Sequence, residues 1–155
     1  MSDSTRSSTR PDIDPRGPRF GAAITALLLL ATVFLTLVGA SAAALWLLIV
    51  ITALFAWGAI AGAGRHPYGL LFKKFVRPRL APPLELERAA PPTFAQAVGL
   101  AVTLVGVVFG LLGVPEAVGI AAAIAFVAAF LNAVFDYCLG CQIYLLLVRA
   151  KPAHA

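Results

Sequence analysis

The sequence contains few charged residues and only two cysteines. Asp, Glu, Lys and Arg make up 12% of its 155 residues, whereas soluble domains contain about 25%. Two cysteines are too few for a small secreted fold held together by several disulfides. Hydrophobic residues, at 61%, exceed the roughly 45–50% of soluble domains. These proportions exclude an ordinary soluble protein and indicate an integral membrane protein.

The hydrophobic residues are concentrated in four stretches, each with roughly the 20 residues needed to cross about 30 Å of hydrocarbon. Backbone polar groups in lipid must be hydrogen-bonded within the segment, so each stretch must be a helix. The sequence therefore predicts an all-α fold, an integral membrane four-helix bundle of two helical hairpins joined by a basic cytoplasmic loop. We expect spans at about 20–38, 42–61, 94–112 and 117–136, with an interfacial extension to 148, within a domain at 12–149 flanked by a disordered tail at 1–11 and a second tail at 150–155.

The basic residues predict how the protein is oriented. Neither short hairpin loop contains any of the 12 Lys and Arg residues. Because Lys and Arg gather in cytoplasmic loops, both termini and the central loop are expected in the cytoplasm. The net charge of +5 fits contact with anionic lipid, so no nucleic-acid partner is expected. The basic residues are Arg6, Arg10, Arg16, Arg19, Arg65, Lys73, Lys74, Arg77, Arg79, Arg88, Arg149 and Lys151.

The central loop begins with a stretch that has two interpretations. P-Y-G-L-L-F-K-K-F-V-R, at 67–77, is either an interfacial helix lying on anionic lipid or a solvated linker with a basic flank. His66 is either a functional residue or a polar side chain at the membrane edge. The candidate residues for binding a partner or lipid headgroups are His66, Arg19, Lys73, Lys74 and Arg77.

Two further patterns concern how helices pack. Gly58-x-x-x-Gly62 and Gly106-x-x-x-Gly110 allow close helix approach, either inside the bundle or at a homodimer face. G-P-R-F-G-A-A and P-P-T-F-A-Q-A, which open the first and third spans, align Phe20 with Phe94. Two hairpins of the same orientation suggest parallel repeats related by an axis along the membrane normal.

Both cysteines occur in the segment F-D-Y-C-L-G-C-Q-I-Y at 135–144. At 1.5 Å per residue, about 20 helical residues from Glu116 bring the chain to the inner membrane boundary, which places Cys138 and Cys141 near the cytoplasm. A later register would bury Asp136 at mid-depth, at a cost of about 2.5–3.5 kcal/mol. The uncharged run before Phe135 favours the first register.

The reactivity of the cysteines depends on whether the last helix is continuous. In an unbroken helix, Asn132, Asp136 and Gly140 share one face and the two cysteines lie on another. In a helix that restarts at an Asp136 N-cap, Cys138 lies in the first turn, where a thiol pKa falls below its usual value of about 8.5. The sequence does not decide between these two structures.

Three functions fit a cytoplasm-facing C-x-x-C. In thiol redox chemistry or sulfur transfer, Cys138 would attack, Cys141 would resolve, and Asp136 would cap, orient or shuttle a proton. In a metal site, Cys138 and Cys141 would need further ligands such as His66 and Asp136. In a scaffold, the thiols would only pack, since Cys is small and apolar. A static disulfide is not expected in reducing cytosol, and no cofactor is predicted.

Several spaced motifs resemble the bacterial family called "domain of unknown function 4395". They are D-x-R-x-x-R-F-G-A at 14–22, H-P-Y at 66–68, R-P-x-L-x-P-P-x-E-x-E-x-A-x-P-x-x-F-A-Q at 77–96, and F-D-Y-C-L-G-C-x-x-Y at 135–144. The resemblance covers about 12–148 and implies a small four-span protein of the bacterial inner membrane. It also implies an association with thioredoxin-like or rhodanese-like proteins. The positions it marks are Asp136, Cys138, Gly140, Cys141, Arg19, Phe20, His66, Pro67, Glu87, Pro91 and Phe94.

Overall fold

The computed structural model describes residues 12–150. The expected tail at 1–11 lies outside the described residues, as do positions 151–155 of the tail expected at 150–155, whereas Ala150 is the last residue of α6. Four long helices account for most of this part of the chain, and the predicted all-α four-helix bundle is confirmed. Shorter helical turns connect the second and third long helices, and one more helix ends the described chain. In chain order the elements are α1 (Arg16–Leu37), α2 (Ser41–Ala61), η1 (Ala63–Arg65), α3 (Pro67–Leu71), η2 (Phe72–Val76), η3 (Arg77–Arg79), α4 (Ala90–Leu111), α5 (Pro115–Phe135) and α6 (Leu139–Ala150).

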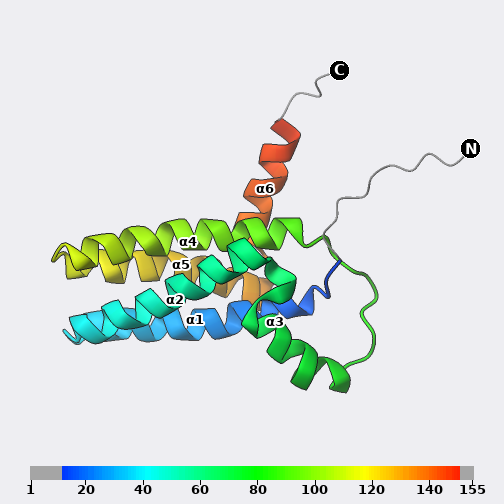
Figure 1. Ribbon diagram of the computed structural model, residues 1–155, viewed down its shortest axis with the longest axis horizontal. Helices are drawn as coiled ribbons and strands as arrows, with labels where there is room; N and C mark the ends of the chain where they lie inside the picture. Colours follow the sequence, from blue (N-terminus) through cyan, green and yellow to red (C-terminus); the bar gives the residue numbers. More distant parts are fainter. Residues whose placement is uncertain (1–11, 151–155) are drawn as a thin grey trace, which may run out of the picture.

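The two hairpins, α1–α2 and α4–α5, pack across each other to form the bundle (Figure 1). α1 packs against α2 and α5, and α4 packs against the same two helices. Each hairpin turns through a glycine with positive φ, +78° at Gly39 and +88° at Gly113. Side chains rarely adopt this conformation, so glycine permits the tight turns that keep the paired helices adjacent.

A closely packed core fills the half of the bundle nearer these two short loops. Leu29, Leu48, Ile51 and Val118 are at most 2% exposed. Gly110 lets α4 approach α5, since a Cβ there would lie 2.6 Å from a methyl group of Val118. Gly106 and Gly110 therefore pack inside the bundle, against α5. Small residues commonly allow such close helix contacts in lipid.

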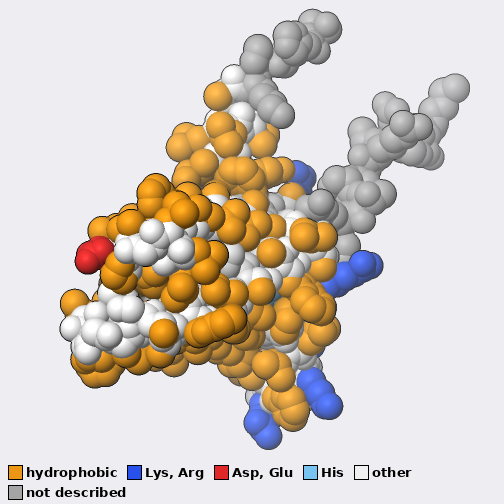
Figure 2. All heavy atoms as spheres, turned by 60° about the vertical axis from the view of Figure 1, so that its left-hand side comes forward, with side chains coloured by type: hydrophobic (Ala, Val, Ile, Leu, Met, Phe, Trp, Pro, Cys, Tyr) orange, Lys and Arg blue, Asp and Glu red, His pale blue; other side chains and the backbone are white. Residues whose placement is uncertain are grey.

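Hydrophobic side chains cover the sides of the bundle, as Figure 2 shows. Four helices, α1, α2, α4 and α5, are long and apolar enough to cross a membrane. The described Lys and Arg residues all lie in segments at the end opposite the short loops. We call this the basic end. A bundle with apolar sides and a basic end indicates a membrane protein, because such a surface is stable against lipid and not against water.

Two shorter helical segments leave the bundle at the basic end, on opposite sides (Figure 1). One is α3 continued by the π-helical turn η2, and the other is α6. Phe72 of η2 is buried against α1, with its ring centroid 5.9 Å from that of Phe20, whereas Leu71 and Phe75 are exposed. Exposed apolar residues on helices that run across the bundle axis are typical of interfacial helices.

The start of the described chain is held against the segment that joins α2 to α4, which we call the central connection. The backbone groups of Ile13 and Glu87 exchange two hydrogen bonds of 2.8 and 2.9 Å. Asp14 accepts side-chain hydrogen bonds from Arg16, whose guanidinium also reaches the carbonyl of Ala81 at 3.0 Å. These bonds hold the pKa of Asp14 below its usual value. The central connection is thus tied to α1.

Candidate functional site

The last long helix ends directly before the cysteine motif. α5 stops at Phe135, and Asp136 adopts a left-handed conformation with φ +56°. The N–H of Tyr137 turns back to donate to the carbonyl of Leu131 at 3.2 Å. Asp and Asn are the non-glycine residues that tolerate this conformation best. The helix is therefore broken, and Asp136 ends α5 instead of acting as the N-cap of the next helix.

Cys138 occupies the N-cap position of α6. Its carbonyl accepts the first helical hydrogen bond from Gln142 at 3.0 Å, and its Sγ accepts the N–H of Cys141 at 3.2 Å. This side-chain contact satisfies one of the N–H groups left unpaired at a helix start, as an N-cap does. The structure therefore places Cys138 at the positive end of the α6 dipole.

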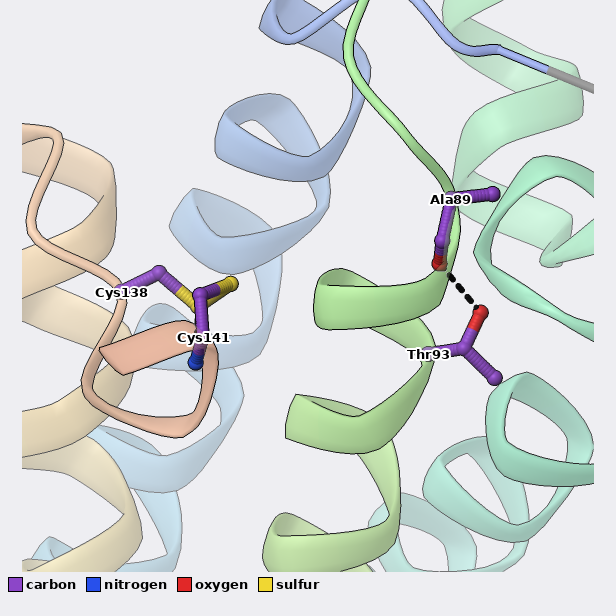
Figure 3. Close-up of a disulfide and its surroundings, with 4 residues drawn as sticks. All are labelled: Ala89, Thr93, Cys138 and Cys141. Atoms are coloured by element: carbon purple, nitrogen blue, oxygen red, sulfur yellow. Dashed lines mark hydrogen bonds between the residues drawn. A yellow bond between two sulfur atoms is a disulfide. The ribbon is translucent and has the colours of Figure 1, made fainter. Parts of the chain in front are cut away.

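Cys138 and Cys141 are joined by a disulfide across the first turn of α6 (Figure 3). Both residues are half-buried. Thr93 of α4 points away from the disulfide, and its hydroxyl donates to the carbonyl of Ala89 at 2.7 Å (Figure 3). The sequence did not lead us to expect a static disulfide, and the structure contains the oxidised form of the pair.

A close helix contact positions this turn. Gly140 is buried against α4, where an added Cβ would lie 2.6 Å from Ala95. One turn further along, the ring centroids of Phe94 and Tyr144 are 5.7 Å apart. α6 therefore rests on the start of α4. The contact at Gly140 positions its first turn, and the aromatic pair positions the next turn.

Arg19 of α1 lies beside the C-terminal end of α5 and the cysteine motif. Its Nε is 3.6 Å from a carboxylate oxygen of Asp136, and its Nη2 donates to the carbonyl of Ala133 at 3.5 Å. A cation at a helix C-terminus is favoured by the helix dipole. Both charged side chains are more than a third exposed, so this pair orients the groups more than it stabilises the fold.

The disulfide borders a cavity of about 540 Å³ in the half of the bundle nearer the basic end. Charged, polar, small and apolar side chains from α1, α2, α4, α5 and α6 line it. Arg19, Asp136, Cys138 and Cys141 all contribute to it. The structure thus brings four of the predicted site residues together around one space.

His66 lies elsewhere and is used as a structural group. It is 6% exposed, its Nε2 is 3.1 Å from the carbonyl of Leu54, and its Nδ1 accepts the N–H of Tyr68 at 3.3 Å. These partners define a neutral ring that donates from Nε2 and accepts at Nδ1. Burial lowers the pKa of His66, and the Leu54 hydrogen bond opposes that effect. His66 is therefore the N-cap of α3, and it does not line the cavity at the disulfide.

The remaining predicted binding residues lie on or beside η2, away from the motif. Lys73 donates to the carbonyl of Gly64 at 3.2 Å, and Lys74 lies over the ring of Phe75 at 5.4 Å. Arg77 follows in η3. Among residues 12–150, no group of three His, Cys, Asp or Glu side chains is placed to hold a metal ion. The ligand set considered for a metal, with His66 beside the cysteines, is not brought together.

The fold and the site define a class, a small polytopic helical membrane protein with a C-x-x-C at the start of a short apolar helix. The chain belongs to the family described as Domain of unknown function (DUF4395), whose sequence profile matches residues 13–149. No curated protein and no solved structure matches it.

The cavity residues that sequence reasoning missed include Thr25, Gln96 and Arg88. Thr25 and Gln96 are polar residues within otherwise apolar spans, which is the signal that could have identified them. Arg88 was counted only as part of the basic loop. Its place at the cavity depends on where α4 begins, at Ala90, and the sequence had placed that start at Phe94.

Proposed function

We propose that this protein is a membrane-anchored thiol redox or sulfur-relay protein that works through Cys138 and Cys141. One observation carries the proposal: the two sulfurs form a disulfide across the first turn of a helix, with Cys138 at its N-cap. The helix dipole and the N–H of Cys141 favour the anionic thiolate of Cys138 over the thiol. A thiolate is the nucleophile in thiol–disulfide exchange, so Cys138 is the attacking residue.

The exchange proceeds in two balanced steps. The Cys138 thiolate attacks a partner's disulfide, forming a mixed disulfide and releasing one partner thiolate. The Cys141 thiolate then attacks Cys138 Sγ, which forms the internal disulfide and releases the second partner thiolate. The partner gains two electrons and the protein loses two. In the sulfur-relay form, Cys138 carries a persulfide, and attack by Cys141 releases hydrosulfide as the internal disulfide forms.

We place the protein in the bacterial inner membrane with both termini and the basic end in the cytoplasm. Support comes from the Lys and Arg residues: those that the structure describes lie at the basic end, and the loops at 38–40 and 112–114 contain none. Lys73, Lys74 and Arg77 would then contact anionic headgroups. The disulfide would be accessible to a soluble thioredoxin-like or rhodanese-like partner.

Trapping the mixed disulfide tests the proposal. In a Cys141→Ala variant the second step is blocked, so a partner attacked by Cys138 stays covalently attached and is recovered on non-reducing gels. Cys138→Ala, which keeps the resolving thiol and removes the attacking one, is the matched control. Adducts in the control alone would reverse the assigned roles. If neither variant forms adducts, and a Cys138→Ser, Cys141→Ser double variant retains full cellular function, the protein is a scaffold.

A further inference from the structure

We propose that the cavity beside the disulfide binds a membrane quinone, which reoxidises the reduced Cys138–Cys141 pair. This inference rests on the proposed thiol redox function and adds its electron acceptor. The cavity reaches from the disulfide and Asp136 into the interior of the bundle, where Phe55 and Val102 line it. Its volume of about 540 Å³ lies within the roughly 300–1,000 Å³ of small-molecule sites.

The cavity is lined by polar side chains that have no hydrogen-bond partner among residues 12–150. Thr25, Gln96 and Asn132 come from α1, α4 and α5, and none donates or accepts a side-chain hydrogen bond within this part of the protein. The other described threonines, Thr32, Thr36, Thr52, Thr93 and Thr103, each donate to the carbonyl four residues earlier. A hydroxyl and two amides in a mostly apolar cavity are donors suited to the carbonyl oxygens of a ligand.

The charges at the cavity mouth favour a neutral ligand. Arg19 and Arg88 line it together with Glu87 and Asp136, so the formal charges balance. An anionic sulfur compound would meet as many carboxylates as guanidinium groups there. A quinone is neutral, has an apolar ring with carbonyl acceptors, and dissolves in the bilayer that surrounds the bundle.

Small side chains create the space for the ring. Ala125, Ala128 and Ala129 of α5 line the cavity and leave room for a ring. The space beside Gly99 of α4 is instead filled by the ring of Phe55, from which an added Cβ would be 2.5 Å away, so Phe55 forms one wall. Aromatic and aliphatic walls with a few convergent donors are typical of cofactor sites.

The proposed step balances without any further reactant. The thiols of Cys138 and Cys141 lose two electrons and two protons as the S–S bond forms. The quinone gains both electrons, and its two carbonyl oxygens take up the protons, giving the quinol. Because the quinone oxidises the pair, the exchange with the partner runs in the reverse direction in this cycle. A thiolate of the reduced partner attacks Cys138 Sγ and releases the Cys141 thiolate, and the partner's second thiolate then attacks the partner sulfur of the mixed disulfide and releases the Cys138 thiolate. The partner's two electrons thus pass through the pair to the quinone.

The test uses the purified full-length protein, reduced, freed of reductant, and mixed with a short-chain ubiquinone analogue without oxygen. We expect one quinone reduced per disulfide formed, followed by quinone absorbance and by maleimide labelling of free thiols. Ala128→Phe fills the cavity and should lower this rate about tenfold or more, equivalent to about 1.4 kcal/mol or more in barrier. Val127→Phe is the matched control, since Val127 is 52% exposed and does not line the cavity.

The outcomes separate this inference from the proposed function. Oxidation by a small soluble disulfide but not by quinone overturns the quinone site and leaves thiol exchange in place. Resistance to both oxidants defeats the proposed function itself. Equal rates in Ala128→Phe and wild type, or equal losses in both Phe variants, also overturn the cavity as the site. Should Ala128→Phe fail to elute as a folded species, Thr25→Val tests the same cavity, and an unchanged apparent quinone affinity in it counts against the proposal.

Discussion

Gly140 lies so close to Ala95 that a Cβ at position 140 would be 2.6 Å from both the Cα and the Cβ of Ala95. Only a residue without a side chain allows the first turn of α6 to rest on α4 at this distance. Since that turn carries both cysteines, this contact sets where the disulfide lies relative to the cavity.

Gly140→Ala should therefore displace α6. The contact partner is backbone and Cβ of a helix and cannot move aside, so overpacking should cost about 1–3 kcal/mol. We expect a lower unfolding temperature in detergent and slower reduction of the disulfide by a soluble dithiol. Gly21→Ala is the control, because its added Cβ would meet Tyr68 at 3.5 Å, an ordinary contact. Equal behaviour of the two variants would contradict the positioning role of Gly140.

The long helices and their pairing could be predicted from the sequence, because hydrophobic length and the need for backbone hydrogen bonds leave little choice in lipid. The break after Phe135 could not, since Asp136 in an apolar segment is compatible with several conformations. One signal was present. The alignment that pairs Phe20 with Phe94 also pairs Asp136 with Gly62, which ends α2 with φ +90°. The glycine that ends α2 with a positive φ therefore indicates that α5 also ends at the equivalent residue, Asp136.

The cavity could not be predicted, because it depends on how four helices pack. Ala128 and Ala129 could equally lie on a lipid-facing or a closely packed surface. The role of Arg19 could not be predicted either, because its charge suggested a contact with lipid headgroups. Its partners in the structure, Asp136 and Ala133, are more than 100 residues away in the chain. Contacts of such separation are set by tertiary packing and leave no local pattern.

Asp136 should be required for its backbone conformation and should modulate the thiols through its charge. Asp136→Asn keeps a residue that tolerates positive φ and removes the charge. A carboxylate near a thiolate disfavours it, so its loss should shift the pH profile of Cys138 alkylation to lower pH. The measurement is the rate of iodoacetamide labelling of the reduced protein as a function of pH.

The conformational role of Asp136 is isolated by Asp136→Val. A β-branched residue at φ +56° is strained by roughly 1–2 kcal/mol, so this variant should unfold at a lower temperature than Asp136→Asn. If both variants were equally stable, the left-handed conformation would not be a constraint at this position.

His66 should make the stability of the fold depend on pH. Burial lowers its pKa in the folded protein below the usual 6.5, so the unfolded chain takes up the proton first as the pH falls. Stability is then full above about pH 6.5 and declines as the pH falls through the folded-state pKa. The unfolding temperature in detergent should decrease between about pH 7.5 and 5.5.

His66→Asn provides the comparison for this effect. The amide oxygen can still accept the N–H of Tyr68, but the side chain does not titrate. We expect the variant to be less stable than the wild type. Its unfolding temperature should no longer fall over the pH range in which that of the wild type falls. If the variant shows the same pH dependence of the unfolding temperature as the wild type, a group other than His66 causes it.

The proposed orientation can be tested with single reporter cysteines in a Cys138→Ser, Cys141→Ser background. Ser41→Cys, at the start of α2, reports on the short-loop end, and Lys74→Cys, in η2, reports on the basic end. Because Lys and Arg are retained on the cytoplasmic side, a membrane-impermeant maleimide should label Cys at 41 in intact cells once the outer membrane is permeabilised. It should label Cys at 74 only after the inner membrane is opened. The reverse pattern would place the basic end and the cysteine motif outside the cytoplasm, where a lasting disulfide at 138–141 would be the expected state.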